Sequence, residues 1–111
     1  MSDMDIRQHA RLRETILFPL DYGTRGAIIG KVAEALAASA ARCHLSFEGR
    51  YRHARLLLAR DLLHREVLSF NELSDGEMIA ISSWVQDTAR EEVLDRWLEK
   101  TFGKQLTLTL E

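Results

Sequence analysis

Histidine and arginine side chains gather in the middle of this 111-residue chain, where they could hold a metal ion or an anion. His53 and His64 lie eleven positions apart on an expected helix, which separates them by about 16 Å along the helix axis. Ligands of one metal ion must all lie within bonding distance of it, so these two histidines cannot share an ion. Asp61 is closer to His64, but two ligands do not complete a site. We therefore expect no bound metal and no other cofactor.

Catalysis finds equally little support in the residue types and their spacing. The chain shows no Ser-His-Asp or Cys-His arrangement that would activate a nucleophile. Its single cysteine, Cys43, follows an alanine-rich segment and fits the role of a small buried hydrophobe. The carboxylates of Glu91, Glu92 and Asp95 fit a solvated helix face. These patterns indicate a binding protein rather than an enzyme.

Charge is divided unevenly along the chain, although the net charge is only −2. Residues 1–66 carry 11 Lys and Arg against 8 Asp and Glu, whereas residues 67–111 carry 4 against 9. Most of the positive excess lies between Arg42 and Arg65. These arginines could form a patch for nucleic acid or an acidic partner, or pair internally with the acidic C-terminal half, which the mildly acidic total charge favours. The candidate contact residues of such a patch are Arg50, Arg52, His53, Arg60 and His64.

Length and composition favour a single all-α domain. A chain of 111 residues can bury one core and is short for two. Its 46% hydrophobic and 29% charged residues and its single proline are typical of a helix-rich globular protein. The weakly polar stretch from Ala33 to Ala41 is too short to span a bilayer, and Asp3 and Asp5 do not suit a secretory signal. We expect a cytoplasmic protein without a membrane partner.

Hydrophobic periodicity predicts two helices in the first half of the chain. The first spans residues 5–18 and ends before Pro19, which cannot continue the helical hydrogen bonds. The second begins with Thr24 as N-cap and runs to about His44. Residues 45–49 are expected to form a loop.

The third predicted helix, residues 51–67, is apolar nearly all round, which is typical of a helix packed among others. One polar strip on it collects His53, Arg60 and His64, at spacings of seven and four residues. This strip could contact phosphate or a partner carboxylate. A solvated seam on a buried helix is the plainer interpretation.

Serine and glutamate pairs mark the helix starts of the C-terminal half. Ser69 with Glu72 and Ser74 with Glu77 both match the capping box and predict a short turn followed by a firm helix start at Ser74. Another such pair at residues 88 and 91 predicts a break before the last helix, with one continuous helix from 75 to 102 as the alternative. Gly103 supplies the helix stop.

The last residues of the chain alternate leucine with polar residues, as an extended segment does. The hexapeptide Gln105-Leu106-Thr107-Leu108-Thr109-Leu110 resembles the motif by which many bacterial replication and repair proteins bind the ring-shaped DNA polymerase sliding clamp. The resemblance implies that Gln105 hydrogen-bonds at one subsite while Leu108 and Leu110 fill an apolar pocket, with Leu106 also in the contacting segment. Pairing of this segment as a strand, within the fold or with a second copy, is the alternative.

A second resemblance concerns the segment from Leu73 to Glu77. Its sequence Leu-Ser-Asp-Gly-Glu, following an arginine-rich helix, is similar to small phage regulatory proteins. The similarity implies that the third and fourth helices form a helix-turn-helix. Against this, the fourth helix begins with Asp75 and Glu77 and lacks residues that read base edges.

Taken together, these patterns predict a single-domain bundle of four to five helices over residues 1–103, with a short extended tail over 104–111. The expected function is that of a replication-associated regulator, or a phage or plasmid accessory factor, that docks on the sliding clamp through the tail. The alternatives are a helical homodimer that pairs its tails as strands, and a regulator that binds nucleic acid through its arginine-rich third helix.

Overall fold

The computed structural model describes residues 4–13, 19–47 and 49–103. This part of the chain is all-α and forms one domain with five α-helices and no strand. The helices are α1 (Arg7–Arg13), α2 (Tyr22–Arg42), α3 (Tyr51–Leu63), α4 (Asp75–Gln86) and α5 (Glu91–Leu98). Two 3-10 turns, η1 (Phe70–Glu72) and η2 (Thr88–Arg90), precede α4 and α5, and a π-helical turn, η3 (Glu99–Gly103), follows α5.

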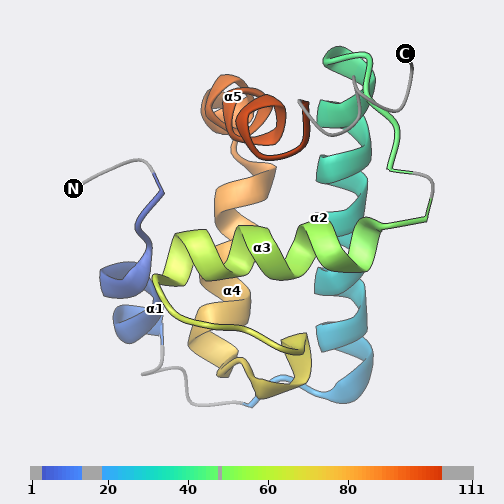
Figure 1. Ribbon diagram of the computed structural model, residues 1–111. Coiled ribbons are helices and arrows are strands. Elements are labelled where there is room, and N and C mark those ends of the chain that lie inside the picture. Colours follow the sequence, from blue (N-terminus) through green and yellow to red (C-terminus); the bar gives the residue numbers. More distant parts are fainter. Residues whose placement is uncertain (1–3, 14–18, 48, 104–111) are drawn as a thin grey trace.

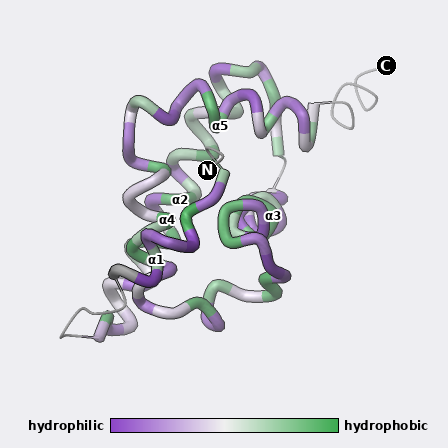
Figure 2. The backbone as a smooth tube through the Cα atoms, turned by 90° about the vertical axis from the view of Figure 1, so that its left-hand side faces the viewer, coloured by the Kyte–Doolittle hydropathy of each residue, from purple (hydrophilic) through white to green (hydrophobic). Residues whose placement is uncertain are grey.

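The bundle is arranged around α2 and α4, which pack against each other. Figure 1 shows α3 lying across both of these helices, with α1 beside α4 and α5 near the far end of α2. Figure 2 shows α3 nearly end-on and colours both hydrophobic and hydrophilic residues around it. No helix of the described ranges is long and apolar enough to cross a membrane.

Buried apolar side chains from every helix meet in one core. Leu36 of α2, Leu58 and Leu62 of α3, and Ile81 of α4 are fully buried, so the centre of the bundle lies where these helices cross. Phe102 joins this core from η3, with its ring 5.2 Å from that of Phe47. Such burial supplies most of the free energy that offsets the ordering of the chain.

Helix α2 begins three residues earlier than the sequence predicts. Its N-cap is Asp21, whose Oδ1 accepts a hydrogen bond of 2.6 Å from the backbone amide of Thr24. The prediction of Thr24 as N-cap is therefore wrong, because Asp21 already caps this turn with a side chain equally suited to it. The helix ends at Arg42, and His44 lies beyond it with a left-handed φ of 57°.

Helix α3 ends at Leu63, before the predicted end at residue 67. His64 adopts a left-handed conformation with φ 55°, and its amide donates to the carbonyl of Arg60, which closes the helix. Val67 kept the apolar pattern going in the sequence, but it is buried from an irregular segment instead. The residues from 64 to 74 form what we call the 64–74 connection, which includes η1.

The predicted serine caps differ in their outcome. Ser74 forms a complete capping box, because its Oγ accepts from the amide of Glu77 and Glu77 accepts from the amide of Ser74. Ser69 accepts from the amide of Asn71, but the carboxylate of Glu72 accepts from Leu68 rather than from Ser69. The box at Ser69 is therefore incomplete and begins only the short turn η1.

The chain breaks between α4 and α5, which decides between the two predicted arrangements in favour of separate helices. Asp87 ends α4, and its Oδ1 accepts from the amide of Ala89 at 2.9 Å, which starts η2. The prediction that Thr88 caps this break is wrong, because the preceding aspartate takes that role. Gly103 is the last residue of η3 and the last residue that the structure describes.

Candidate interaction surface

Arginines of the basic segment pair with carboxylates of the acidic C-terminal half. Arg42 binds Asp95 of α5 through two nitrogens, with Nη2 2.8 Å from Oδ1 and Nε 2.9 Å from Oδ2. Arg65 binds Glu77 of α4, with Nη2 2.8 Å from Oε1. These two contacts confirm the internal pairing that the charge distribution favoured. They also take two arginines out of any patch for nucleic acid.

The pKa values of both carboxylates in these pairs are lowered by their arginine partners. Burial would raise the pKa of Glu77, but hydrogen bonds from Arg65 and from the amide of Ser74 outweigh it and hold the pKa below the ordinary 4.5. The hydrogen bond from Arg42 lowers the pKa of Asp95 against the opposing effect of burial. Both carboxyl groups are therefore ionised near neutral pH and hold their arginines in place.

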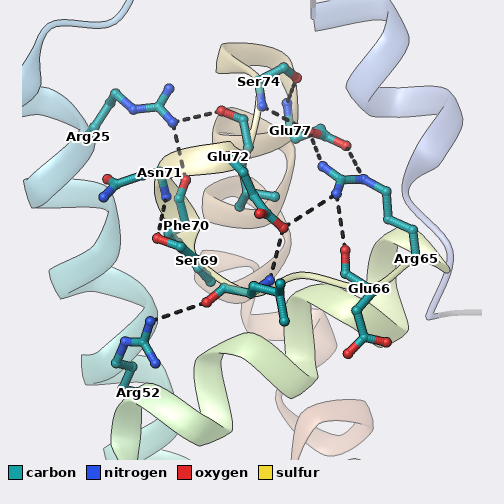
Figure 3. A network of polar contacts seen from close by, with 12 residues as sticks. Arg25, Arg52, Arg65, Glu66, Ser69, Phe70, Asn71, Glu72, Ser74 and Glu77 are labelled. Carbon is teal, nitrogen blue, oxygen red and sulfur yellow. Dashed lines mark hydrogen bonds and ion pairs between the residues drawn. The ribbon is translucent and has the colours of Figure 1, made fainter.

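Ion pairs and hydrogen bonds of two arginines fasten the 64–74 connection to the bundle. Arg25 of α2 bonds to Asp75 and to the carbonyls of Phe70 and Leu73, at 2.7–3.2 Å. On the opposite side, Arg65 reaches Glu77 and approaches Glu72, as Figure 3 shows. The backbone of the connection is therefore fixed by charged side chains as well as by its buried residues.

Leu68 stands out within this fixed segment because 69% of it is exposed. Its amide donates to Oε1 of Glu72 at 2.9 Å, and its carbonyl accepts from Nη2 of Arg52 at 3.2 Å. Both polar groups of its backbone are satisfied, so the residue is held in place while its apolar side chain faces solvent. Its neighbours Val67 and Phe70 are each 5% exposed, which makes the outward position of Leu68 a local exception.

Arg55 of α3 packs on Phe70, two residues beyond Leu68, and has no anionic partner among the described residues. Its guanidinium carbon is 5.8 Å from the centre of the Phe70 ring, and its Nε is buried without a hydrogen-bond partner among the described residues. Burial, together with the charge of Arg52, lowers the pKa of Arg55. A half-buried cation that no carboxylate balances is costly for a fold. It is therefore the feature of this surface that most needs an explanation.

Sequence reasoning did not place Arg55 among the candidates. A signal was nevertheless present, because the helical neighbours three and four positions away are Tyr51, Arg52, Leu58 and Ala59, none of them acidic. An arginine on a helix without a carboxylate in these positions must find its partner elsewhere. Neither the stacking on Phe70 nor the exposed Leu68 could be read from the pattern.

The five candidates of the basic patch make different contacts within the fold. Arg50 bonds to the carbonyl of Phe47, and Arg52 faces the 64–74 connection. The ring of His53 lies 6.2 Å from that of Phe102. Arg60 and His64 share a groove at the end of α3 with Trp97 and Lys100.

Within that groove the cations are partly matched by local carboxylates. Arg60 pairs with its neighbour Asp61 at 2.9 Å, and Asp61 also accepts from Nε1 of Trp97 at 2.7 Å. Nε2 of His64 lies 3.7 Å from the carboxylate of Asp5. The groove therefore carries charges of both signs and offers no uniform positive field for a phosphate backbone.

The remaining features of the sequence prediction are the tail motif, the expected absence of a metal site and the single cysteine. Gln105, Leu106, Leu108 and Leu110 lie outside the described residues. No group of three or more histidine, cysteine or acidic side chains able to hold a metal ion occurs in the described ranges. Cys43 is half-buried, and burial raises the pKa of its thiol to about 11, so the thiolate is scarce at neutral pH.

The length of the 64–74 connection argues against a helix-turn-helix made by α3 and α4. That motif joins its helices by a turn of about three or four residues. Here a whole irregular segment with its own 3-10 turn separates Leu63 from Asp75. No family model, curated protein or solved structure matches the chain in the comparisons made.

Proposed function

We propose that this protein is a non-enzymatic binding protein that docks on the bacterial DNA polymerase sliding clamp through residues 105–110. In this proposal it acts as a replication-associated regulator, or as a phage or plasmid accessory factor, because occupation of the clamp groove competes with polymerases. Gln105 fixes the register of the peptide, while Leu108 and Leu110 provide the apolar anchors.

The observation that supports this proposal most directly is the anchoring of the turn just before the motif. The ring of Phe102 packs 5.2 Å from Phe47 and 6.0 Å from Trp97, in edge-to-face geometry. Phe102 is 2% exposed and is followed directly by Gly103. A hexapeptide that starts two residues later is thereby tethered to a fixed point of the bundle.

The distribution of arginine partners also favours this function over nucleic-acid binding through α3. Arg42, Arg60 and Arg65 are each paired with a carboxylate of the same chain. A nucleic-acid site needs several cations free to replace counterions along the backbone. The segment from residue 42 to residue 65 therefore keeps fewer cations free for such a role than its sequence suggests.

The test is direct binding of the full chain to a purified bacterial sliding clamp, measured by surface plasmon resonance. Changing both Leu108 and Leu110 to Ala should weaken binding by about thirtyfold or more, because each leucine contributes on the order of 1–3 kcal/mol when buried. A matched control changes Thr107 and Thr109 to Ala, on the other side of the extended segment, and should bind nearly as the parent does. Failure of the intact protein to bind the clamp refutes the proposal.

The same variants separate this function from the homodimer alternative. If the tail pairs as a strand with a second copy, the leucine variant should dissociate a dimer, which sedimentation velocity would show. A docking peptide predicts an unchanged sedimentation coefficient instead.

A further inference from the structure

We propose that Leu68, Arg52 and Arg55 form a docking surface for an acidic peptide segment of a partner protein, which we call the Leu68 surface. The occupant presents a carboxylate to the arginines and an apolar side chain to Leu68. The surface includes none of residues 105–110, so the proposal does not depend on binding to the clamp.

The three residues belong together because both arginines contact the same short segment, residues 68–70. Arg52 donates to the carbonyl of Leu68 at 3.2 Å, and Arg55 stacks on Phe70, two residues further along the same connection. Arg52 and Arg55 are one helical turn apart on α3 and repel each other. A positive pair therefore lies beside an exposed apolar side chain.

Charge complementarity identifies the chemistry of the occupant. Arg55 forms neither a hydrogen bond nor an ion pair within the part of the chain that the structure describes. Its guanidinium carries donors in a planar fork that matches a carboxylate in two-point geometry. An incoming carboxylate would balance a cation that the fold leaves half-buried, which provides the free energy for recognition.

The surrounding charges favour a peptide carboxylate over a nucleic acid. Glu66 and Glu72 are exposed and lie on the same connection, on either side of Leu68 in sequence. Glu72 bonds to the Leu68 amide, so a negative charge stands next to the proposed site. An extended phosphate backbone would be repelled here, whereas a single carboxylate can reach the arginines.

The rigidity of Leu68 makes it suitable as an apolar anchor. Both of its backbone polar groups are bonded, so little conformational freedom remains to be lost when a partner binds. An exposed leucine on a fixed backbone, rimmed by charged residues, has the layout of the centre and rim of a small interface.

The test is selection of a random peptide library, displayed on phage, against the full-length protein. We expect the enriched sequences to share an Asp or Glu close to an apolar residue. The best peptide is then synthesised with a fluorescent label, and its binding is measured by fluorescence anisotropy. Replacement of its acidic residue by the matching amide should weaken binding by about tenfold, as loss of a charge-assisted hydrogen bond does.

Variants of the protein locate the site. Arg55→Met and Leu68→Ser should each weaken peptide binding by about fivefold to tenfold. Arg96→Met removes an arginine of α5 that is exposed and pairs with Glu92, far from Leu68 in sequence, and serves as the control with unchanged binding. Arg55→Met should leave the thermal midpoint within about 3 °C of the parent, because the residue has no ionic partner among the described residues.

Several outcomes would overturn the proposal. One is a selection without acidic residues in its consensus. Another is peptide binding that Arg55→Met and Leu68→Ser leave unchanged. A single-stranded oligonucleotide that displaces the peptide, with affinity that falls steeply with salt, would assign the surface to nucleic acid instead. A fall of the Arg55→Met midpoint by more than about 8 °C would show that the arginine serves the fold.

Discussion

Replacement of Asp95 by Ala should destabilise the bundle, because this carboxylate joins α5 to α2. Its Oδ1 accepts from Oγ of Ser39 at 2.5 Å and from Nη2 of Arg42 at 2.8 Å. Ser39 is completely buried, whereas the side chains of Arg42 and Asp95 are 37% and 22% exposed. The buried hydroxyl and the exposed guanidinium therefore contribute differently to the cost of removing Asp95.

The loss of stability expected for Asp95→Ala follows from its contacts with Ser39 and Arg42. A buried hydroxyl that loses its hydrogen-bond partner lowers the free energy of unfolding by about 1–3 kcal/mol. We use the lower half of this range, because the Ser39 hydroxyl can turn to donate to a carbonyl of the preceding helical turn. The exposed pair with Arg42 adds only about 0.5–1 kcal/mol after solvent screening. We expect Asp95→Ala to lower the free energy of unfolding by about 2 kcal/mol.

Urea denaturation followed by circular dichroism measures this change. Ser39→Ala alone should cost about 1 kcal/mol, and the double variant should cost less than the sum of the two single variants by roughly 0.5–1 kcal/mol, because the hydroxyl is then no longer left unpaired. An Asp95→Ala cost under about 0.5 kcal/mol, or strict additivity in the double variant, would refute the role assigned to this contact.

The pH dependence gives an independent check. Hydrogen bonding to Arg42 lowers the pKa of Asp95 below its ordinary 3.8 in the folded state. A depressed carboxyl pKa adds stability that is fully present above the unfolded value and is lost as the pH falls through the folded value. The difference in stability between parent and Asp95→Ala should therefore be constant near neutral pH and shrink below about pH 4.

Three further predictions concern the helix cap, the thiol and the tail. Ser74→Ala should lower the free energy of unfolding by about 1 kcal/mol through loss of the cap on Glu77, whereas Ser74→Thr should retain most of it in the same denaturation assay. Cys43, with its pKa raised to about 11, should react slowly with Ellman's reagent at pH 8 in the native protein and rapidly in urea. Deletion of residues 105–111 should change the free energy of unfolding by less than about 0.5 kcal/mol, and a larger loss would favour the tail as a paired strand.

Features set by residues within one helical turn of each other were predicted best. The capping box at Ser74 was read correctly because both of its bonds join residues three positions apart. At the start of α2, two good N-cap residues, Asp21 and Thr24, stand close together, and local preference alone could not choose between them. The all-α class followed from the hydrophobic periodicity of several segments taken together.

The end of α3 shows where local reasoning fails. Val67 continues the apolar pattern of the helix, so the sequence predicts helix up to that residue. In the folded chain His64 leaves the helical conformation, and Val67 reaches the core from the 64–74 connection. Burial can be achieved from either conformation, and the packing of neighbouring segments selects one of them.

The candidate site was predictable only in its composition. The sequence indicated that arginines are concentrated between residues 42 and 65 and that many of them pair internally. It did not indicate that Arg55 has no carboxylate partner in the described ranges or that Leu68 faces solvent. Both depend on how the 64–74 connection lies against α3, which no periodicity encodes.

The sequence by itself determined the helical class, the starts of α3 and α4, and the division of charge between the two halves of the chain. These properties depend on contacts within about four residues or on composition alone. Only the tertiary structure decided which arginine meets which carboxylate, since Arg42 and Asp95 lie 53 positions apart. It also decided which apolar side chain remains exposed. The physical reason is that ion pairs and burial depend on distances between packed segments, and many packings are compatible with the same local preferences.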